Sequence, residues 1–259
     1  MAHALAVPRS FLYAHPEYIL DAETQNRLQK LVNRRLDGEP MAYILGEKEF
    51  WSLNLLVNGD TMIPRPETEL LVELILEKFT EPSSRHPCQG DISISIADLG
   101  TGCGAIAIAL ASSRPHWQIT ATDQSAAALQ VAVSNAQRLH LSNVTFYQGS
   151  WCAALPKKHF TAIVSNPPYI RANDPHLRQG DLRFEPQAAL IGGSDGLAAF
   201  REIITQAPDY LIDGAWLLLE HGYDQGHSVR DLMQAAGFQA VETRQDLAGI
   251  DRVTLGILT

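Results

Sequence analysis

The sequence predicts an α/β fold, in which helices cover both faces of a mostly parallel sheet of about seven strands and a small helical unit precedes the sheet. Two observations lead to this prediction. Strand-like apolar runs alternate with helical patterns from residue 94 onward, which is typical of right-handed crossover connections. The chain also has 259 residues, 46% of them hydrophobic, enough for one sizeable core and a smaller second unit.

The first part of the chain predicts a helix and a hairpin. Apolar residues recur at helical intervals over residues 21–36. Residues 49–64 contain two strand-like pieces around Asn58-Gly59, a dipeptide that favours the tight turn of a hairpin. We therefore expect residues 1–63 to form a helical N-terminal domain that ends in a β-hairpin connector.

The second predicted domain covers residues 64–259. It opens with a helix at residues 67–79 and a linker at 80–91 that is rich in Pro, Ser and Gly. Predicted strands cover residues 94–99, 118–122, 144–147, 160–165, 215–220, 238–243 and 252–258. Predicted helices cover residues 105–113, 125–139, 196–207 and 224–236. No helical pattern separates the last two strands, so we expect them to close the sheet as an antiparallel pair.

The net charge disfavours a nucleic-acid partner. The formal charge is −9 at pH 7, so the protein as a whole repels polyphosphate, and direct nucleic-acid binding is not expected. A local basic cluster, formed by Arg27, Lys30, Arg34 and Arg35, fits a solvated helix face better than a phosphate-binding surface.

The sequence gives no signal for a membrane, an export pathway or a metal. The N-terminus does not resemble a signal peptide, and no apolar stretch approaches the roughly 20 residues of a membrane helix. We therefore expect a cytoplasmic protein without a membrane partner, and a monomer. Cys88, Cys103 and Cys152 are too widely spaced for a disulfide framework or a paired-cysteine zinc site, so no metal is expected.

A glycine-rich turn predicts a nucleoside-containing cofactor. Gly100, Gly102 and Gly104 follow a buried strand, at the sheet edge where such folds bind ligands. Asp123 ends the next strand, where an acidic side chain accepts hydrogen bonds from a ribose. Trp151 follows the third strand and is a candidate to pack on adenine. One residue separates the last two glycines, where a dinucleotide motif has two, and this favours S-adenosylmethionine.

The segment Asn166, Pro167, Pro168 and Tyr169 predicts the acceptor site. The two prolines stiffen the backbone directly after a strand. The Asn166 side-chain oxygen and the Pro167 carbonyl can each accept a hydrogen bond from one N–H of a planar amide or amino group, and Tyr169 can stack on that group. Such a nitrogen has a delocalised lone pair and must be oriented and made more nucleophilic. The segment therefore predicts methylation of a planar nitrogen.

The motifs DLGTGCG, ATD, GSW and NPPY resemble the series found in class I methyltransferases that act on planar nitrogens, which have a Rossmann-like, seven-stranded domain. Three further segments, EKEFWSLNLLV, IPRPETE and FEPQAALIGGSDGL, resemble more narrowly the release factor glutamine methyltransferases. The resemblance covers most of the chain from residue 25 onward. It implies transfer of a methyl group from S-adenosyl-L-methionine to the side-chain N(5) of the glutamine in the Gly-Gly-Gln motif of peptide chain release factors, with S-adenosyl-L-homocysteine as the other product.

The resemblance also implies residue roles. The cofactor's methionine end would contact Gly100, Thr101, Gly102, Cys103 and Gly104, its ribose Asp123, and its adenine Trp151, with Asn166 beside the cofactor. The acceptor glutamine would be held by Asn166, Pro167, Pro168 and Tyr169. The N-terminal domain would dock on the release factor.

Three other functions remain open at this point. The first is methylation of an exocyclic amino group of DNA or RNA, since adenine presents a planar amino group similar to the amide of glutamine. The second is a nicotinamide-dependent oxidoreductase, which uses the same kind of sheet but leaves the NPPY segment unexplained. The third is a translation-factor-binding protein without enzymatic activity. Binding of S-adenosylmethionine distinguishes the methyltransferases from the last two.

Overall fold

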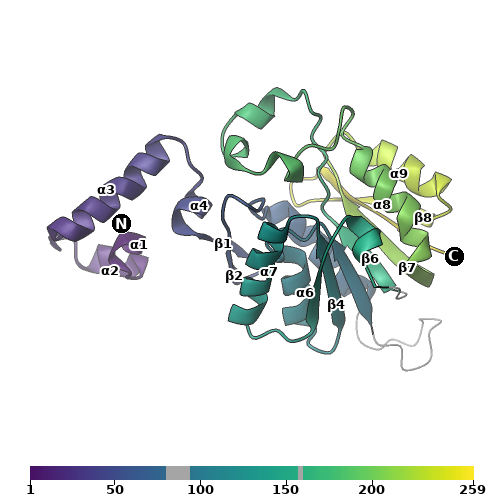
Figure 1. Cartoon of the computed structure of the whole chain (residues 1–259), viewed down its shortest axis with the longest axis horizontal. Helices are drawn as coiled ribbons and strands as arrows, with labels where there is room; N and C mark the ends of the chain where they lie inside the picture. Colours follow the sequence, from purple (N-terminus) through teal and green to yellow (C-terminus); the bar gives the residue numbers. More distant parts are fainter. Residues whose placement is uncertain (80–93, 157–159) are drawn as a thin grey trace.

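The chain adopts the α/β architecture that the sequence predicts. The structure is a computed structural model and describes residues 1–79, 94–156 and 160–259. The predicted linker at residues 80–91, together with Cys88, lies outside the described residues. Helices flank a central sheet, and a group of N-terminal helices stands beside this body (Figure 1).

The central sheet consists of β3 (Ser95–Leu99), β4 (Gln118–Asp123), β5 (Val144–Gln148), β6 (Phe160–Ser165), β7 (Leu211–Glu220), β8 (Gln239–Gln245) and β9 (Asp251–Ile257). Its strand order is β5-β4-β3-β6-β7-β9-β8. The pairs from β5 to β7 are parallel, and β9 runs antiparallel to β7 and β8. The predicted antiparallel closing pair is confirmed. The strand order reverses beside β3, and a ligand cleft forms at such a position.

Within the described residues, five helices cover the sheet, and each was predicted from its apolar pattern. They are α5 (Glu69–Lys78), α6 (Ala105–Ser113), α7 (Ala126–Arg138), α8 (Ala198–Gln206) and α9 (Gly226–Ala235). The short 3-10 helices are η1 (Pro66–Thr68), η2 (Trp151–Ala154), η3 (Pro175–Arg178), η4 (Leu182–Phe184), η5 (Gln187–Ala189) and η6 (Ala207–Asp209). The predicted helix at residues 67–79 therefore begins as η1 and continues as α5.

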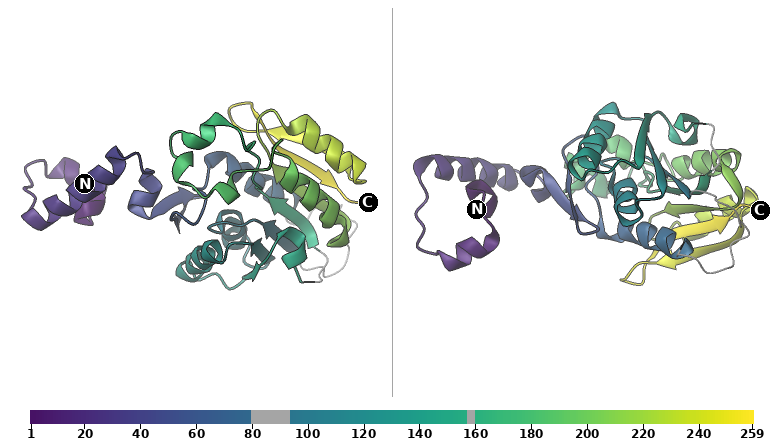
Figure 2. Two further views of the ribbon diagram at one scale, coloured as in Figure 1. Left: turned by 45° about the horizontal axis from the view of Figure 1, so that its top comes forward. Right: turned by 90° about the horizontal axis from the view of Figure 1, so that it is seen from below.

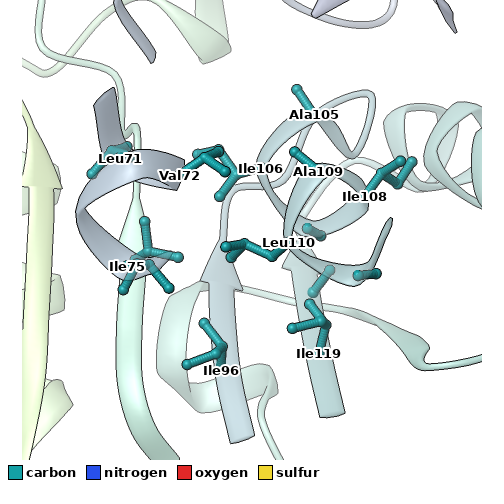
Figure 3. Packing of buried hydrophobic residues seen from close by; sticks show 14 of the residues in the cluster. Leu71, Val72, Ile75, Ile96, Ala105, Ile106, Ile108, Ala109, Leu110 and Ile119 are labelled. Carbon is teal, nitrogen blue, oxygen red and sulfur yellow. The ribbon is translucent and has the colours of Figure 1, made fainter. Parts of the chain in front are cut away.

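The core lies on both faces of the sheet. On one face α5 and α6 pack on the central strands, as the side chains of Leu71, Ile75, Leu110 and Ile96 show in Figure 3. Most of α6 is buried, which explains why its sequence is apolar on every side. On the other face, α8 and α9 cover a second cluster that contains Phe200 and parts of β6 and β7. The two clusters hold the carboxyl ends of the strands in fixed positions.

The N-terminal helices are α1 (Ala2–Leu5), α2 (Arg9–Ala14), α3 (Ala22–Leu36) and α4 (Met41–Leu45). The predicted helix is α3, and it begins where the Asp21 side chain accepts a hydrogen bond from Thr24 N at 2.7 Å. The other three are too short to show a helical period, and the sequence did not predict them. Figure 2 shows this purple group extending away from the body.

Two of the four predicted basic residues on α3 are engaged in ion pairs. Arg34 pairs with Glu39, and Arg35 lies 3.8 Å from Asp181 of the main body. Nearby, Arg183 Nη2 donates to the backbone carbonyl of Asp37 at 2.7 Å. The end of α3 is therefore attached to the loop that contains η4, and the basic cluster is partly neutralised.

The connector hairpin is present, but its turn was predicted at the wrong position. It pairs β1 (Glu47–Phe50) with β2 (Leu53–Leu56), so Trp51 and Ser52 form the turn. Both have positive φ, 53° and 58°, as a tight hairpin turn requires. The predicted dipeptide, Asn58-Gly59, follows the hairpin instead.

Tertiary contacts explain why residues without a turn preference form this turn. The backbone N–H of Trp51 donates to the Glu69 carboxylate at 2.8 Å, and its indole Nε1 donates to Ser113 Oγ at 3.0 Å. The Trp51 ring also packs against the core cluster under α5 and α6. These contacts offset the strain of positive φ at two residues other than glycine. Asn58 makes a separate turn, in which its side chain accepts from Asp60 N at 3.0 Å.

Candidate active site

A cleft opens at the carboxyl edge of the parallel strands. Most residues predicted for the cofactor and the acceptor line it: Gly100, Thr101, Gly102, Cys103, Asp123, Trp151, Asn166 and Pro168. Asp60, Met62 and Pro64, which follow the hairpin, form another part of its wall. The structure thus brings the two predicted sites into one cleft, a concave site of the kind that binds small molecules.

The glycine turn between β3 and α6 has the conformation that its sequence predicts. Gly100, Gly102 and Gly104 have φ angles of 69°, 58° and 89°, a region that other residues rarely adopt. Gly104 does not line the cleft among the described residues. Gly104 instead packs against Ile108 and Ala132. A β-carbon at position 104 would lie 3.2 Å from Ala132 Cβ and closer still to Ile108. Two of the glycines therefore line the cleft, and the third allows the helix to pack.

Asp123 ends β4 beside this turn, as expected. Its Oδ2 accepts a hydrogen bond from Gly102 N at 2.9 Å, and its Oδ1 accepts one from Ser125 N at 2.9 Å. A carboxylate oxygen can accept two hydrogen bonds, so both oxygens keep capacity for a ribose diol. With Asp60 on the same wall, the cleft has an acidic lining that suits a positively charged ligand.

Asp98 is part of the turn, and the sequence analysis did not assign it a role. It is fully buried, and its Oδ2 accepts hydrogen bonds from Thr101 Oγ1 at 2.6 Å and from Ala107 N at 3.1 Å. Its Oδ1 has no partner among the described residues. Burial raises the pKa of Asp98 to about 7, against the opposing effect of the two hydrogen bonds. Asp98 fastens the strand, the turn and α6 together from below.

Trp151 closes one side of the cleft. It opens η2, has a φ of 43° and packs partly against the second core cluster. Its ring lies over the glycine turn, because Trp151 Cζ3 is 3.1 Å from where a β-carbon on Gly100 would stand. A β-carbon at position 100 would therefore require this ring to shift by a few tenths of an ångström.

Cys103 and Asn135 connect the turn to the hairpin. The Asn135 amide accepts from Leu56 N at 2.7 Å and donates to the carbonyls of Leu56 and Cys103, both at 3.0 Å. The Cys103 thiol is buried, and burial raises its pKa to about 12, so it is protonated at neutral pH. This agrees with a packing role for Cys103 and not a reactive one.

The NPPY segment lies directly after β6, with Asn166 and Pro168 on the cleft wall. Asn166 Nδ2 donates to Thr68 Oγ1 at 3.0 Å. Pro167 is buried, and Tyr169 packs partly against the second core cluster, so neither lines the cleft among the described residues. Burial and the nearby Glu220 carboxyl raise the pKa of the Tyr169 hydroxyl. The stacking of Tyr169 on an acceptor stays a prediction.

The IPRPETE and FEPQ segments meet at a buried ion pair. Glu185 is buried, accepts a hydrogen bond from Ile63 N at 3.1 Å and pairs with Arg65. Directly after it, Pro186 and Ala188 line the cleft. Sequence reasoning treated these segments only as points of resemblance. The pair fastens a loop of the cleft wall to the chain after the hairpin.

Comparisons with known proteins agree with this geometry. A family model described as Methyltransferase small domain matches residues 71–180, and one described as PrmC N-terminal domain matches residues 1–46. A Pyrococcus furiosus methyltransferase of known structure has a TM-score of 0.57 at 15% identity, over 90% of this chain and 98% of its own. A 16S rRNA N2 G1207 methyltransferase from T. Thermophilus, in complex with AdoMet and guanosine, also has a TM-score of 0.57, at 17% identity, over 82% of this chain and 50% of its own.

The fold and the cleft therefore define a methyltransferase. Among curated relatives, the release factor glutamine methyltransferase of Coxiella burnetii is 53% identical over 95% of this chain and 84% of its own. That of Vibrio cholerae is 52% identical over 99% and 86%, and that of Escherichia coli K12 is 46% identical over 99% and 89%. The chain belongs to the release factor glutamine methyltransferase family.

The described residues contain neither a membrane span nor a metal cluster. No helix within residues 1–79, 94–156 and 160–259 has the length and apolarity needed to cross a membrane. In the same ranges, no group of three or more His, Cys, Asp or Glu side chains is arranged to hold a metal ion.

Proposed function

We propose that this protein transfers a methyl group from S-adenosyl-L-methionine to the side-chain N(5) of the glutamine in the Gly-Gly-Gln motif of peptide chain release factors. The observation that carries the proposal is that Asn166, the glycine turn and Asp123 line one cleft. The names of the curated relatives support the acceptor. The other product is S-adenosyl-L-homocysteine.

The residues of the cleft fit the proposed cofactor. The positive φ angles at Gly100 and Gly102 allow the close backbone approach that the methionine end requires, beside the start of α6. In this proposal Asp123 binds the ribose and Trp151 packs on the adenine, and both residues line the cleft. The carboxylates of Asp60 and Asp123 favour a ligand that carries a sulfonium charge.

The proposed mechanism depends on orientation of the acceptor amide. When bound, the cofactor would supply an electrophilic methyl group from its sulfonium and keep the electron pair of the broken S–C bond. In this proposal Asn166 Oδ1 accepts a hydrogen bond from one N–H of the glutamine, and the backbone carbonyl of Pro167, which lies between the cleft-lining Asn166 and Pro168, accepts one from the other. These two bonds raise the electron density on nitrogen and hold it in line with the methyl carbon. The nitrogen then loses a proton to solvent, so no strong base is required.

The N-terminal unit, residues 1–63 with the hairpin, is the proposed docking surface for the release factor. Its hairpin packs on the main body, whereas its first helices extend away from the sheet (Figure 2). These helices and their connections expose Tyr13, Ile19 and Leu36, which are 86%, 87% and 78% exposed. Large apolar side chains on an extended arm are typical of a protein-binding surface. We propose that the protein acts as a monomer in the cytoplasm, where release factors work.

Mass spectrometry tests this function. Purified protein and S-adenosylmethionine are incubated with a release factor, and with a variant whose Gly-Gly-Gln glutamine is replaced by alanine. We expect one added methyl group on the first factor and none on the second. Methylation of DNA or RNA, with neither factor modified, would establish the alternative acceptor. The partly neutralised basic cluster of α3 does not favour that outcome.

A further inference from the structure

Two buried polar residues, Thr68 and Glu220, lie near Asn166, and Thr68 also lines the cleft. In the parallel pair of β6 and β7, Ser165 lies opposite Leu219, so Asn166 and Glu220 are neighbours at the edge of the sheet. Glu220 lies on the same face as Leu218, which belongs to the core cluster under α5. Thr68 immediately precedes that helix.

Thr68 contacts both Asn166 and Glu220. It is 3% exposed, ends η1 with helical φ and ψ, and its side chain makes no capping bond to α5. Its Oγ1 instead accepts from Asn166 Nδ2 at 3.0 Å. The Thr68 hydroxyl also lies close enough to the Glu220 carboxyl, which is 1% exposed, to favour its ionised form, and Glu220 Oε2 has no other hydrogen-bond partner among the described residues.

The direction of these hydrogen bonds determines which atom Asn166 presents to the cleft. A threonine hydroxyl has one proton, and an ionised carboxylate only accepts hydrogen bonds. The proton of Thr68 therefore points to Glu220, and the lone pairs of Oγ1 remain for the Asn166 NH2 group. With its NH2 group held there, Asn166 turns its oxygen toward the acceptor.

We propose that Glu220 and Thr68 are positioning residues for methyl transfer: ionised Glu220 orients the Thr68 hydroxyl, which holds the Asn166 amide with its oxygen toward the acceptor nitrogen. The inference rests on the proposed role of Asn166 and extends it. Without Glu220 as a fixed acceptor, the Thr68 hydroxyl can rotate and donate to Asn166 Oδ1. The Asn166 amide then turns its NH2 group toward the NH2 group of the substrate glutamine. The site thereby loses one hydrogen-bond acceptor for that group.

The surroundings of Glu220 make this arrangement sensitive to pH. Burial raises the pKa of Glu220 to about 7, and the nearby Glu67 acts in the same direction. The hydroxyls of Thr68 and Tyr169 and the charge of Arg252 favour the ionised form. Glu220 therefore changes its charge near neutrality, and the oriented state of Asn166 is populated above that pH.

The test measures single-turnover methylation of a release factor at saturating S-adenosylmethionine, as a function of pH. For the wild type we expect the rate to rise through about pH 7 to a plateau. Glu220→Gln and Thr68→Val should lower the plateau on the order of 100-fold and remove this inflection. Thr68→Ser, which keeps the hydroxyl, should restore most of the rate. Glu73→Gln, the same change at an exposed site on α5, should match the wild type.

Two reference measurements make the result decisive. The dissociation constant for S-adenosylmethionine and the thermal unfolding midpoint show whether each variant is folded. If Glu220→Gln does not fold, the comparison of Thr68→Val with Thr68→Ser decides the question. The inference is overturned if Glu220→Gln or Thr68→Val keeps the wild-type rate and inflection while Asn166→Ala is inactive. A fully active Asn166→Ala would instead overturn the proposed role of Asn166 itself.

Discussion

Asp123 accepts a hydrogen bond from Gly102 N at 2.9 Å, which joins the end of β4 to the glycine turn of β3. The same carboxylate is the proposed ribose ligand. In this proposal one side chain both shapes the turn and binds the cofactor. Its loss should therefore lower the affinity for S-adenosylmethionine in two ways, through the missing ribose contact and through a looser turn.

Asp123→Ala should weaken S-adenosylmethionine binding by about 10- to 100-fold, since hydrogen bonds to a charged group contribute roughly 1.5–3 kcal/mol. Isothermal titration calorimetry measures this affinity. Asp213→Ala, at an exposed position of β7, is the control and should bind as the wild type does. Equal affinity of the wild type and Asp123→Ala would show that the ribose binds elsewhere.

Gly100→Ala should disturb the position of Trp151. A β-carbon at position 100 stands 3.1 Å from the Trp151 ring, so the ring must move, and the positive φ adds strain. Together these effects should cost about 1–3 kcal/mol of stability and also weaken cofactor binding. Calorimetry and thermal unfolding provide the measurements.

Gly214→Ala separates the strain of a positive φ from the displacement of Trp151, the two causes of the effect expected for Gly100→Ala. Gly214 has a φ of 80°, but a β-carbon there meets no atom within 4 Å. This variant therefore carries the strain alone and should keep wild-type cofactor affinity. A Gly100→Ala variant with the same affinity would mean that Trp151 does not pack on the cofactor.

Ile19→Asp should weaken docking of the release factor without changing the chemical step. Ile19 lies in the exposed link between α2 and α3, so the change should leave the fold intact. Loss of one buried isoleucine contact, about 1.5–3 kcal/mol, predicts a KM at least tenfold higher at constant kcat. Leu247→Asp, at an equally exposed apolar side chain in the β8–β9 connection, is the control. An unchanged KM for Ile19→Asp would argue against docking through this region.

Asp98 should make the stability depend on pH. Its pKa is about 7 in the folded protein, whereas an unfolded aspartate has a pKa of about 3.9. Between these values the folded state retains a proton that the unfolded chain releases. The contribution of Asp98 to the free energy of unfolding therefore falls as the pH rises through this window, by about 1.4 kcal/mol per pKa unit, and is constant above it.

Asp98→Asn should flatten that dependence. Thr101 and Ala107 both donate to Oδ2, so the oxygen of an asparagine can accept both bonds without a buried charge. Urea unfolding of the wild type and the variant between about pH 4 and pH 8 measures the difference. Parallel curves for the two proteins would show that Asp98 does not hold the proton.

The sequence predicted the features that depend on local pattern. Alternating strands and helices identified the sheet, and glycines with one-residue spacing identified the turn, because both preferences act over a few neighbouring residues. The hairpin turn at Trp51-Ser52 was not predictable in this way. Its positive φ angles are held by Glu69 and Ser113, which are distant in sequence.

The same limit applies to the polar residues around the cleft. Glu220 and Thr68 are 152 positions apart in sequence, and only the register of β6 with β7 and the packing of α5 bring them to Asn166. Glu185 and Arg65 meet in a similar way across the cleft wall. Glu220 was predicted only as the last residue of an apolar strand and was assigned no role.

Asn166 is the residue proposed to orient an acceptor glutamine for methyl transfer. The most direct measurement is mass-spectrometric mapping of a release factor after incubation with the wild type or with Asn166→Ala, at S-adenosylmethionine concentrations that saturate both. We expect one methyl group on the Gly-Gly-Gln glutamine with the wild type, and no modification with Asn166→Ala despite retained cofactor binding. Equal methylation of that glutamine by both proteins would contradict the account.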